Sequence, residues 1–85
     1  MAKTVVATPI PAPQALHDAE TLGKFVRAAR TQSGMGIHEA AAFCGVAVST
    51  MSKLERANGD VRLSSILQVC RMLGVTLTIA AGDSQ

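Results

Sequence analysis

The sequence is poor in aromatic residues and in charge, and both deficits limit what the chain can be. Only two of its 85 residues are aromatic, both of them phenylalanine, although 48% are hydrophobic. A core built from this chain must therefore consist mainly of aliphatic side chains, methionine and alanine. The formal net charge is only +2, which is too small to indicate nucleic-acid binding by itself. A chain of this length forms one small domain with a marginal core.

Membrane spans and metal-binding motifs are also missing. No apolar run approaches the roughly 20 residues of a membrane-spanning helix, so we expect no membrane partner. The two cysteines, Cys44 and Cys70, form no C-x-x-C or Cys/His pair at metal-ligand spacing. Both fall on apolar helical stripes, where reduced cysteine behaves as a small hydrophobe. Because the chain also carries no signal-peptide pattern, we expect a cytoplasmic protein without metal or cofactor.

No catalytic constellation is recognisable either. Ser33, Ser64 and Ser65 have no histidine and acid arranged around them, and His17 and His38 lie in different contexts. A nucleophile or general base needs such partners within hydrogen-bond reach. No glycine motif that would hold a phosphate is present. We therefore expect no enzymatic activity.

Apolar residues recur at helical spacing through residues 15–74, which predicts an all-α domain. Asp18 or Thr21 is the expected cap of the first helix, Gly34 suits the left-handed conformation after its end, and Gly74 stops the last helix. We expect four helices. The first starts between residues 15 and 21 and ends at 33–36. The other three span about 37–44, 48–56 and 63–73. The expected inward-facing residues are Leu22, Phe25, Val26, Ala29, Ile37, Ala40, Ala41, Cys44, Met51, Leu54, Leu63, Ile66, Leu67, Cys70 and Leu73.

The stretch from Gly36 to Arg56 contains two short helical runs joined by a tight turn at Gly45, as in a helix-turn-helix unit. Its segment AAAFCGVAVSTMSKLER resembles the Cro/CI-type (XRE) helix-turn-helix, and the resemblance extends from about Thr21 to Ile79. The flanks LGKFVRAARTQSGM and VRLSSILQVCRMLGVTLTI are most similar to the HipB branch of DNA-binding antitoxins. Small plasmid-encoded repressors of the Kor type share the size and layout. The resemblance implies a four- to five-helix, lambda-repressor-like domain in the bacterial cytoplasm, nucleoid-associated when it is bound to double-stranded operator DNA.

In residues 75–81 the spacing of the large apolar residues changes from helical to every second position, which predicts a β-strand. A lone strand in a helical chain needs a partner for its backbone groups. The simplest partner is the same strand of a second copy in a twofold homodimer, and this arrangement also resembles the HipB dimer. The alternative is pairing with Thr4–Val6. The expected dimer-interface residues are Val75, Thr76, Leu77, Thr78 and Ile79.

Residues 1–14 contain prolines at positions 9, 11 and 13, which exclude a helix. The segment has no pattern to bury, so we predict a flexible, extended arm. The arm either crosses the dimer, touches DNA or is a disordered tail. Residues 82–85 form a short C-terminal tail.

Basic residues are concentrated in the central part of the chain. Residues 21–56 hold five of them against two acidic residues, Glu39 and Glu55. If they form a stripe on one face, they are the electrostatic footprint of DNA binding; otherwise they are an ordinary solvated surface. The five are Lys24, Arg27, Arg30, Lys53 and Arg56.

The resemblance implies that the helix at 48–56 enters the major groove of DNA. Ala47 and Val48 lie where polar residues are common, so they can contact only thymine methyl groups, and Ala47 cannot cap the helix. We therefore expect phosphate contacts and DNA shape to carry much of the recognition. Arg30 and Glu55 match positions that form an ion pair in the family. The expected DNA-binding residues are Ile37, His38, Ala47, Val48, Ser49, Thr50, Ser52, Lys53, Arg56 and Asn58.

These observations predict a sequence-specific transcriptional repressor that acts as a homodimer on palindromic operators and regulates its own operon. One alternative is a HipB-like antitoxin that also neutralises a kinase-type toxin or holds a second regulator. The other is a protein-interaction module with weak DNA binding, for which the apolar Ala47 and Val48 are the best reason.

Overall fold

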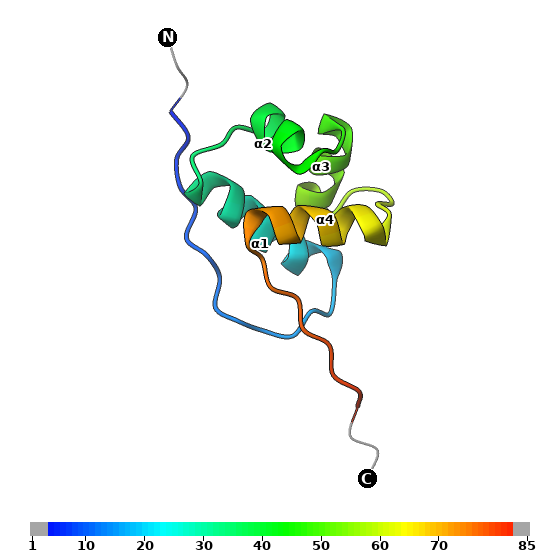
Figure 1. The fold of residues 1–85 in the computed structure, drawn as a ribbon. Helices are drawn as coiled ribbons and strands as arrows, with labels where there is room; N and C mark the ends of the chain where they lie inside the picture. The colour runs from blue at the N-terminus through cyan, green and yellow to red at the C-terminus, as the bar shows by residue number, and fades with distance from the viewer. Residues whose placement is uncertain (1–3, 83–85) are drawn as a thin grey trace.

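The structure is a computed structural model, and it describes residues 4–82. The first three residues of the predicted arm, 1–3, and the last three of the predicted C-terminal tail, 83–85, lie outside the described part. Four helices are formed within residues 4–82, and each of the four predicted helices is confirmed. α4 crosses in front of α1, and α2 and α3 lie together above them (Figure 1). The helices are α1 (Ala19–Gln32), α2 (Ile37–Cys44), α3 (Val48–Arg56) and α4 (Leu63–Leu73).

Asp18 directly precedes α1, and its side chain caps the helix. Its carboxylate accepts a hydrogen bond from the Thr21 N–H at 2.8 Å and another from the Thr21 hydroxyl at 2.7 Å. The backbone hydrogen bond and then the hydroxyl hold the pKa of Asp18 below its usual value, since both stabilise the ionised carboxylate. Of the two predicted caps, Asp18 is therefore the one that is used. Gly34, just beyond α1, has φ of 74°, as predicted.

The core is aliphatic, as the composition requires. Its largest fully buried side chains are Met51, Val26, Val69 and Cys44. Val69 was not among the predicted core residues, whereas Leu63 and Leu67, which were, are 67% and 47% exposed. α4 packs on α1 and α2 through Ile66, Val69, Cys70 and Leu73. The buried residues and the residues predicted to be buried both have helical spacing. The periodicity therefore does not tell which of two apolar faces of α4 packs against the core.

The two cysteines are core residues, as predicted. Cys44 is 1% exposed and Cys70 is 2% exposed, and both are free thiols. Burial raises the pKa of both, and the neighbouring Cys44 raises that of Cys70 further. At neutral pH both therefore remain protonated and act as small apolar side chains.

Ala57, the residue after α3, adopts the left-handed conformation with φ of 54°. An L-residue there is strained by about 1 kcal/mol, because its Cβ crowds the following carbonyl oxygen. Ala57→Gly is therefore expected to raise the free energy of unfolding by about 0.5 kcal/mol, after part of the gain is lost to the larger freedom of glycine in the unfolded chain. Urea denaturation measures the change. In the control, Ala42→Gly on the exposed side of α2, the same substitution should instead lower stability by about 1 kcal/mol. A loss of stability in both variants would contradict the assigned strain.

The C-terminal segment from residue 75 onward has no regular secondary structure through residue 82. The predicted strand is therefore absent from the single chain, and so is the alternative pairing with residues 4–6. The Val75 N–H donates to the Cys70 carbonyl at 2.8 Å and closes the end of α4. Beyond it, residues 76–78 line a cavity together with α1 and the arm, and the chain then runs away from the helices (Figure 1). Within residues 4–82, no other segment forms backbone hydrogen bonds with residues 76–82, so the ladder that a strand requires is not completed in the single chain.

The N-terminal arm contacts the last turn of α1. The Thr8 N–H donates to the Thr31 hydroxyl at 2.9 Å, and the Gln32 side chain donates to the Thr8 carbonyl, also at 2.9 Å. Thr31 is itself buried, with 6% of its surface exposed. The backbone groups of Thr8 are thus both held by side chains of one helix.

Candidate DNA-binding surface

The turn between α2 and α3 reverses the chain within three residues. Gly45 has φ of 73°, a conformation that glycine adopts without strain, and the Val46 N–H donates to the Ala41 carbonyl at 3.0 Å. Ala40 and Ala41 are almost fully buried, so α3 can approach α2 closely. This is the tight turn that the sequence predicted, and it fixes the angle at which α3 leaves the domain.

α3 has one buried face and one exposed face. Met51 and Leu54 lie in the core with 0% and 5% of their surfaces exposed, whereas Ser49 and Lys53 face solvent. Ala47 precedes the helix in an extended conformation and makes no side-chain hydrogen bond to it. The N–H groups of the first turn therefore point outward without a side-chain acceptor. A helix end of this kind attracts an anion such as a phosphate.

An ion pair joins α3 to α1. Arg30 donates from Nε to one Glu55 carboxylate oxygen at 2.6 Å and from Nη2 to the other at 2.9 Å. Its Nη1 donates to the Met35 carbonyl at 2.9 Å, just before α2. The Arg30 and Glu55 side chains are 12% and 6% exposed. The ion pair inferred from the family resemblance is confirmed, and Arg30 consequently does not belong to an exposed basic stripe.

A second contact between α1 and α3 was not foreseen from the sequence. Gly23 is buried, and a Cβ added to it would lie 2.6 Å from the Glu55 carbonyl oxygen and 2.7 Å from that of Leu54. The two backbones therefore touch at this point. The sequence offered one signal for this contact, a glycine inside a helical pattern. Such a glycine destabilises a helix by about 1 kcal/mol relative to alanine, so it indicates a position where a side chain has no room.

The ten predicted DNA-binding residues fall into two groups. Four are half-buried, and of these Ile37 and Val48 pack against the core, which leaves less of their apolar surface for a base. Thr50 and Ser52 are the other two half-buried residues. The exposed ones are His38, Ala47, Ser49, Lys53, Arg56 and Asn58.

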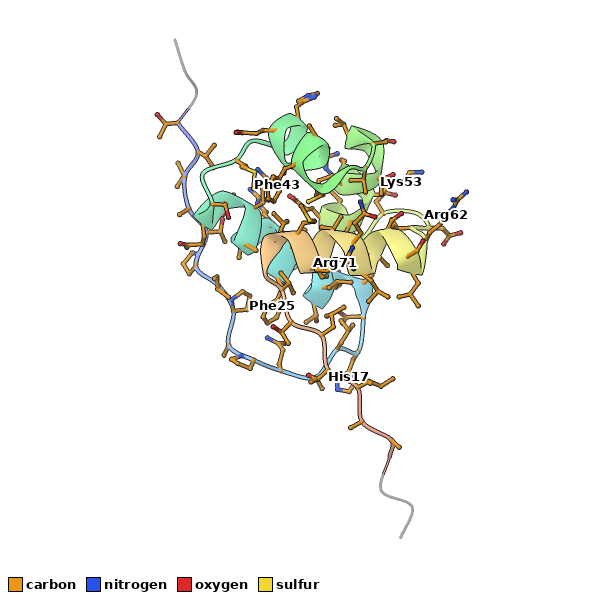
Figure 2. The ribbon with its side chains drawn as sticks, viewed as in Figure 1. His17, Phe25, Phe43, Lys53, Arg62 and Arg71 are labelled. Atoms are coloured by element: carbon orange, nitrogen blue, oxygen red, sulfur yellow. The ribbon has the colours of Figure 1, made fainter. Side chains whose placement is uncertain are left out.

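Arg62 is a further cation on this surface that the sequence analysis did not include. It precedes α4 and lines a shallow polar hollow of about 320 Å³ together with Lys53, Thr50 and Asp60. Lys53 and Arg62 lie on the same side of the domain (Figure 2). The turn at residues 57–60, where Gly59 has φ of 88°, brings the start of α4 back toward α3. The turn-forming residues Asn58, Gly59 and Asp60 were the signal in the sequence that could have found Arg62.

Other kinds of site are not apparent in the part of the chain that the structure describes. Within residues 4–82, no three His, Cys, Asp or Glu side chains lie close enough together to hold a metal ion. None of the described helices is long and apolar enough to cross a membrane.

Comparison with known proteins identifies the family. A family model described as a helix-turn-helix domain matches residues 21–80. The chain therefore belongs to the helix-turn-helix family, as its central motif indicated. A search of curated proteins finds no match.

Solved structures share the fold at low sequence identity. A complex of a HipB variant with an O2 20-mer matches with a TM-score of 0.70 and 19% identity, covering 85% of this chain and 100% of that chain. The HipA–HipB–O2–O3 complex matches with a TM-score of 0.68 and 21% identity, covering 85% and 99%. A structure described as MDT Protein matches with a TM-score of 0.68 and 20% identity, covering 82% and 99%. The resemblance to HipB-type regulators inferred from the residues is thus confirmed at the level of the fold.

Proposed function

We propose that this protein is a sequence-specific DNA-binding transcriptional repressor that acts as a homodimer on palindromic operators and regulates its own operon. The observation that carries the proposal is the anchoring of α3. Its inner face is fixed by the core and by the Arg30–Glu55 ion pair, while its outer face and first turn are open to solvent. A helix held in this way can enter the major groove as a rigid unit.

Recognition would depend more on the DNA backbone than on base edges. The exposed start of α3 offers Ser49 and the methyl group of Ala47, and neither makes the bidentate base contacts that discriminate most strongly. Lys53, Arg56 and Arg62 supply positive charge around the same surface, so they are suited to phosphates. Specificity would then come partly from the shape and deformability of the operator.

Two copies would be joined through residues 75–79. Their alternating apolar residues and unpaired backbone fit the predicted two-stranded intermolecular sheet. A twofold dimer would place the two copies of α3 in successive major grooves, about one helical turn of DNA apart or a small multiple of it. Repression would follow from occlusion of the promoter.

The proposal predicts salt-dependent binding through the cations beside α3. Fluorescence anisotropy at two salt concentrations should show tight binding to DNA from upstream of the protein's own gene and weak binding to a scrambled duplex. Replacing Lys53 or Arg62 by alanine should weaken binding to both duplexes. Each replacement should also reduce the salt slope by about 1, because one phosphate fewer is neutralised by the protein.

Arg71→Ala is the matched control, because Arg71 is an exposed arginine on α4 that does not line the hollow between α3 and α4. This variant should bind as the wild type does. If the Lys53→Ala, Arg62→Ala double variant also binds as the wild type, the assigned surface is wrong. Equal, weak binding of the wild-type protein to both duplexes would favour the protein-interaction module instead.

A second candidate is an antitoxin that also binds a toxin. It is favoured by the shared fold with the HipB chain of a complex that also contains HipA. Co-purification with the product of a neighbouring gene tests it. A stable complex that still binds the operator would assign both activities to the protein, whereas absence of a complex would leave a repressor alone.

A further inference from the structure

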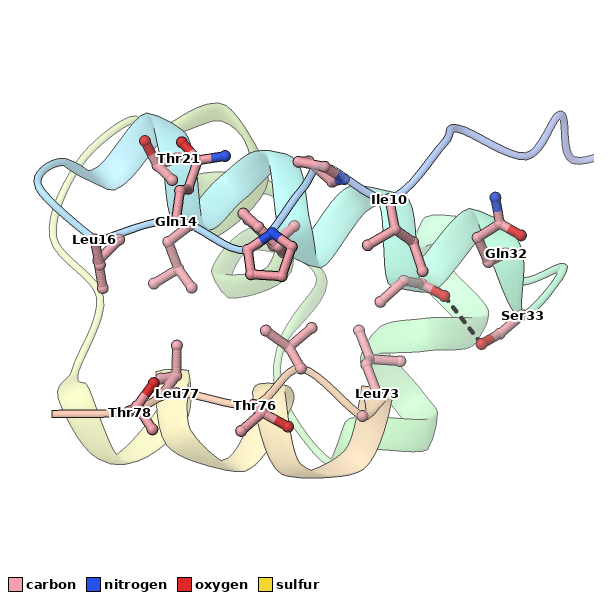
Figure 3. Close-up of a pocket in the computed structure, with 17 residues that line it drawn as sticks. Ile10, Gln14, Leu16, Thr21, Gln32, Ser33, Leu73, Thr76, Leu77 and Thr78 are labelled. Atoms are coloured by element: carbon pink, nitrogen blue, oxygen red, sulfur yellow. Dashed lines mark hydrogen bonds between the residues drawn. The ribbon is translucent and has the colours of Figure 1, made fainter.

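An uncharged cavity lies between the arm, α1 and the C-terminal segment (Figure 3). Its volume is about 570 Å³, and none of its 17 lining residues carries a charge. One wall is the arm, the second is a face of α1 and the third is formed by residues 73–78. Its principal apolar side chains are Ile10, Leu16, Phe25, Leu73, Val75 and Leu77.

We propose that the C-terminal segment of a second copy lies in this cavity, beneath the N-terminal arm, so that the arm is part of the dimer interface. The inference rests on the homodimer proposed above and adds to it the place of the partner's segment and a role for the arm. By the twofold symmetry, each arm would cover the segment of the other protomer.

The composition of the C-terminal segment matches the cavity. Residues 74–82 contain no charged side chain, so no charged group loses its hydration when they enter an uncharged cavity. Ile79 is 98% exposed in the single chain, and Leu77 is 37% exposed. Ile79 directly follows Thr78, the last residue that lines the cavity. Covering so exposed an isoleucine with a second copy would lower the free energy of the dimer.

The position of the cavity also agrees with strand pairing. A strand that pairs with residues 75–79 must run beside them at a spacing of about 4.8 Å. The cavity borders this segment and offers an apolar floor on α1, including Leu22 and Phe25. A partner strand placed there would form backbone hydrogen bonds with residues 75–79 along one edge. It would bury every second side chain against α1.

The arm is suited to cover such a strand without extending the sheet. It is fixed at Thr8, whose backbone N–H and carbonyl are bonded to Thr31 and Gln32. The three prolines that follow at positions 9, 11 and 13 have no N–H to donate to a ladder, and proline is a common means of blunting a sheet edge. The arm would therefore act through apolar side chains, with Ile10 at 59% and Leu16 at 52% exposure in the single chain.

Sedimentation of the full-length chain over a concentration series tests the inference with three variants. Ile79→Asp should abolish the dimer, because it places a charge in the proposed sheet, and it should not affect the fold of the monomer, where Ile79 is exposed. The double variant Ile10→Asn, Leu16→Asn should raise the dimer dissociation constant at least about tenfold, since two apolar side chains are then no longer buried at the interface. Val6→Asn is the matched control, because Val6 is 80% exposed in the same arm and does not line the cavity.

The outcomes separate this inference from the proposed dimer. If Ile79→Asp is monomeric while the Ile10, Leu16 variant dimerises as tightly as the wild type, the dimer stands and the role of the arm is overturned. If Ile79→Asp dimerises like the wild type, or if the wild type is a monomer, the proposed dimer and the role of the arm are both overturned. The cavity would then be open to a small neutral ligand or to the chain's own C-terminal segment. Isotope-filtered NOEs between Ile10 of one protomer and Ile79 of the other, in a mixed labelled and unlabelled sample, would confirm the contact.

Discussion

Replacement of Glu55 by alanine is expected to lower the free energy of unfolding by about 3 kcal/mol, because the change leaves the nearly buried guanidinium of Arg30 without its carboxylate. In a domain of this size, the loss corresponds to a fall in melting temperature of about 12 °C or more. Arg30 keeps one bond to the Met35 carbonyl, so part of its hydrogen bonding survives. Thermal unfolding followed by circular dichroism measures the change.

Glu39→Ala is the matched control, since Glu39 is an exposed acid on α2. It should change stability by less than about 0.5 kcal/mol. The ion pair is structural, so the remaining folded Glu55→Ala protein should keep its ranking of DNA sequences at low temperature. An unchanged melting temperature would show that the pair does not hold α3 to α1.

Replacement of Gly23 by alanine is expected to destabilise the domain by about 2 kcal/mol, even though alanine favours a helix. The added Cβ would meet two backbone carbonyl oxygens of α3, at 2.6 Å and 2.7 Å, and a backbone cannot move aside as a flexible side chain can. α3 must then shift away from α1. We therefore also expect the affinity for the operator to fall by more than the unfolded fraction explains.

A graded series makes this test stricter. Gly23→Val should cost more than Gly23→Ala, because it adds two further carbons at the same contact. Lys24→Ala, at the exposed neighbouring position of α1, should change stability by less than about 0.5 kcal/mol. If Gly23→Ala is as stable as the wild type or more so, helix propensity outweighs the contact and α3 is not held as closely as the structure indicates.

Local interactions explain why the helices could be placed from the sequence. Asp18 caps α1 through a residue three positions away, and Gly45 ends α2 by its own backbone conformation. Signals of this kind depend on neighbours in the chain, so they are visible without a fold. The apolar spacing of Met51 and Leu54 likewise identified the inner face of α3.

The residues that the sequence did not reveal, or that it placed on the wrong face, depend on contacts between distant parts of the chain. Leu63 and Leu67 have the same helical spacing as the residues of α4 that are buried, and only the positions of α1 and α2 decide which face is covered. The role of Gly23 follows from the approach of α3, and the place of Arg62 follows from the turn that returns α4 to α3. The Arg30–Glu55 pair was anticipated from a family resemblance, because a separation of 25 residues carries no local signal.

The sequence by itself determined four helices, the tight turn between α2 and α3, an aliphatic core and an arm that cannot be helical. It determined these because capping, periodicity and proline chemistry act over a few residues. Only the tertiary structure decided which face of α4 is buried, that α3 rests on the backbone of Gly23, and that the arm and the C-terminal segment border one uncharged cavity. Those features arise where segments far apart in the chain meet, and the free energy of such contacts depends on the geometry of both sides.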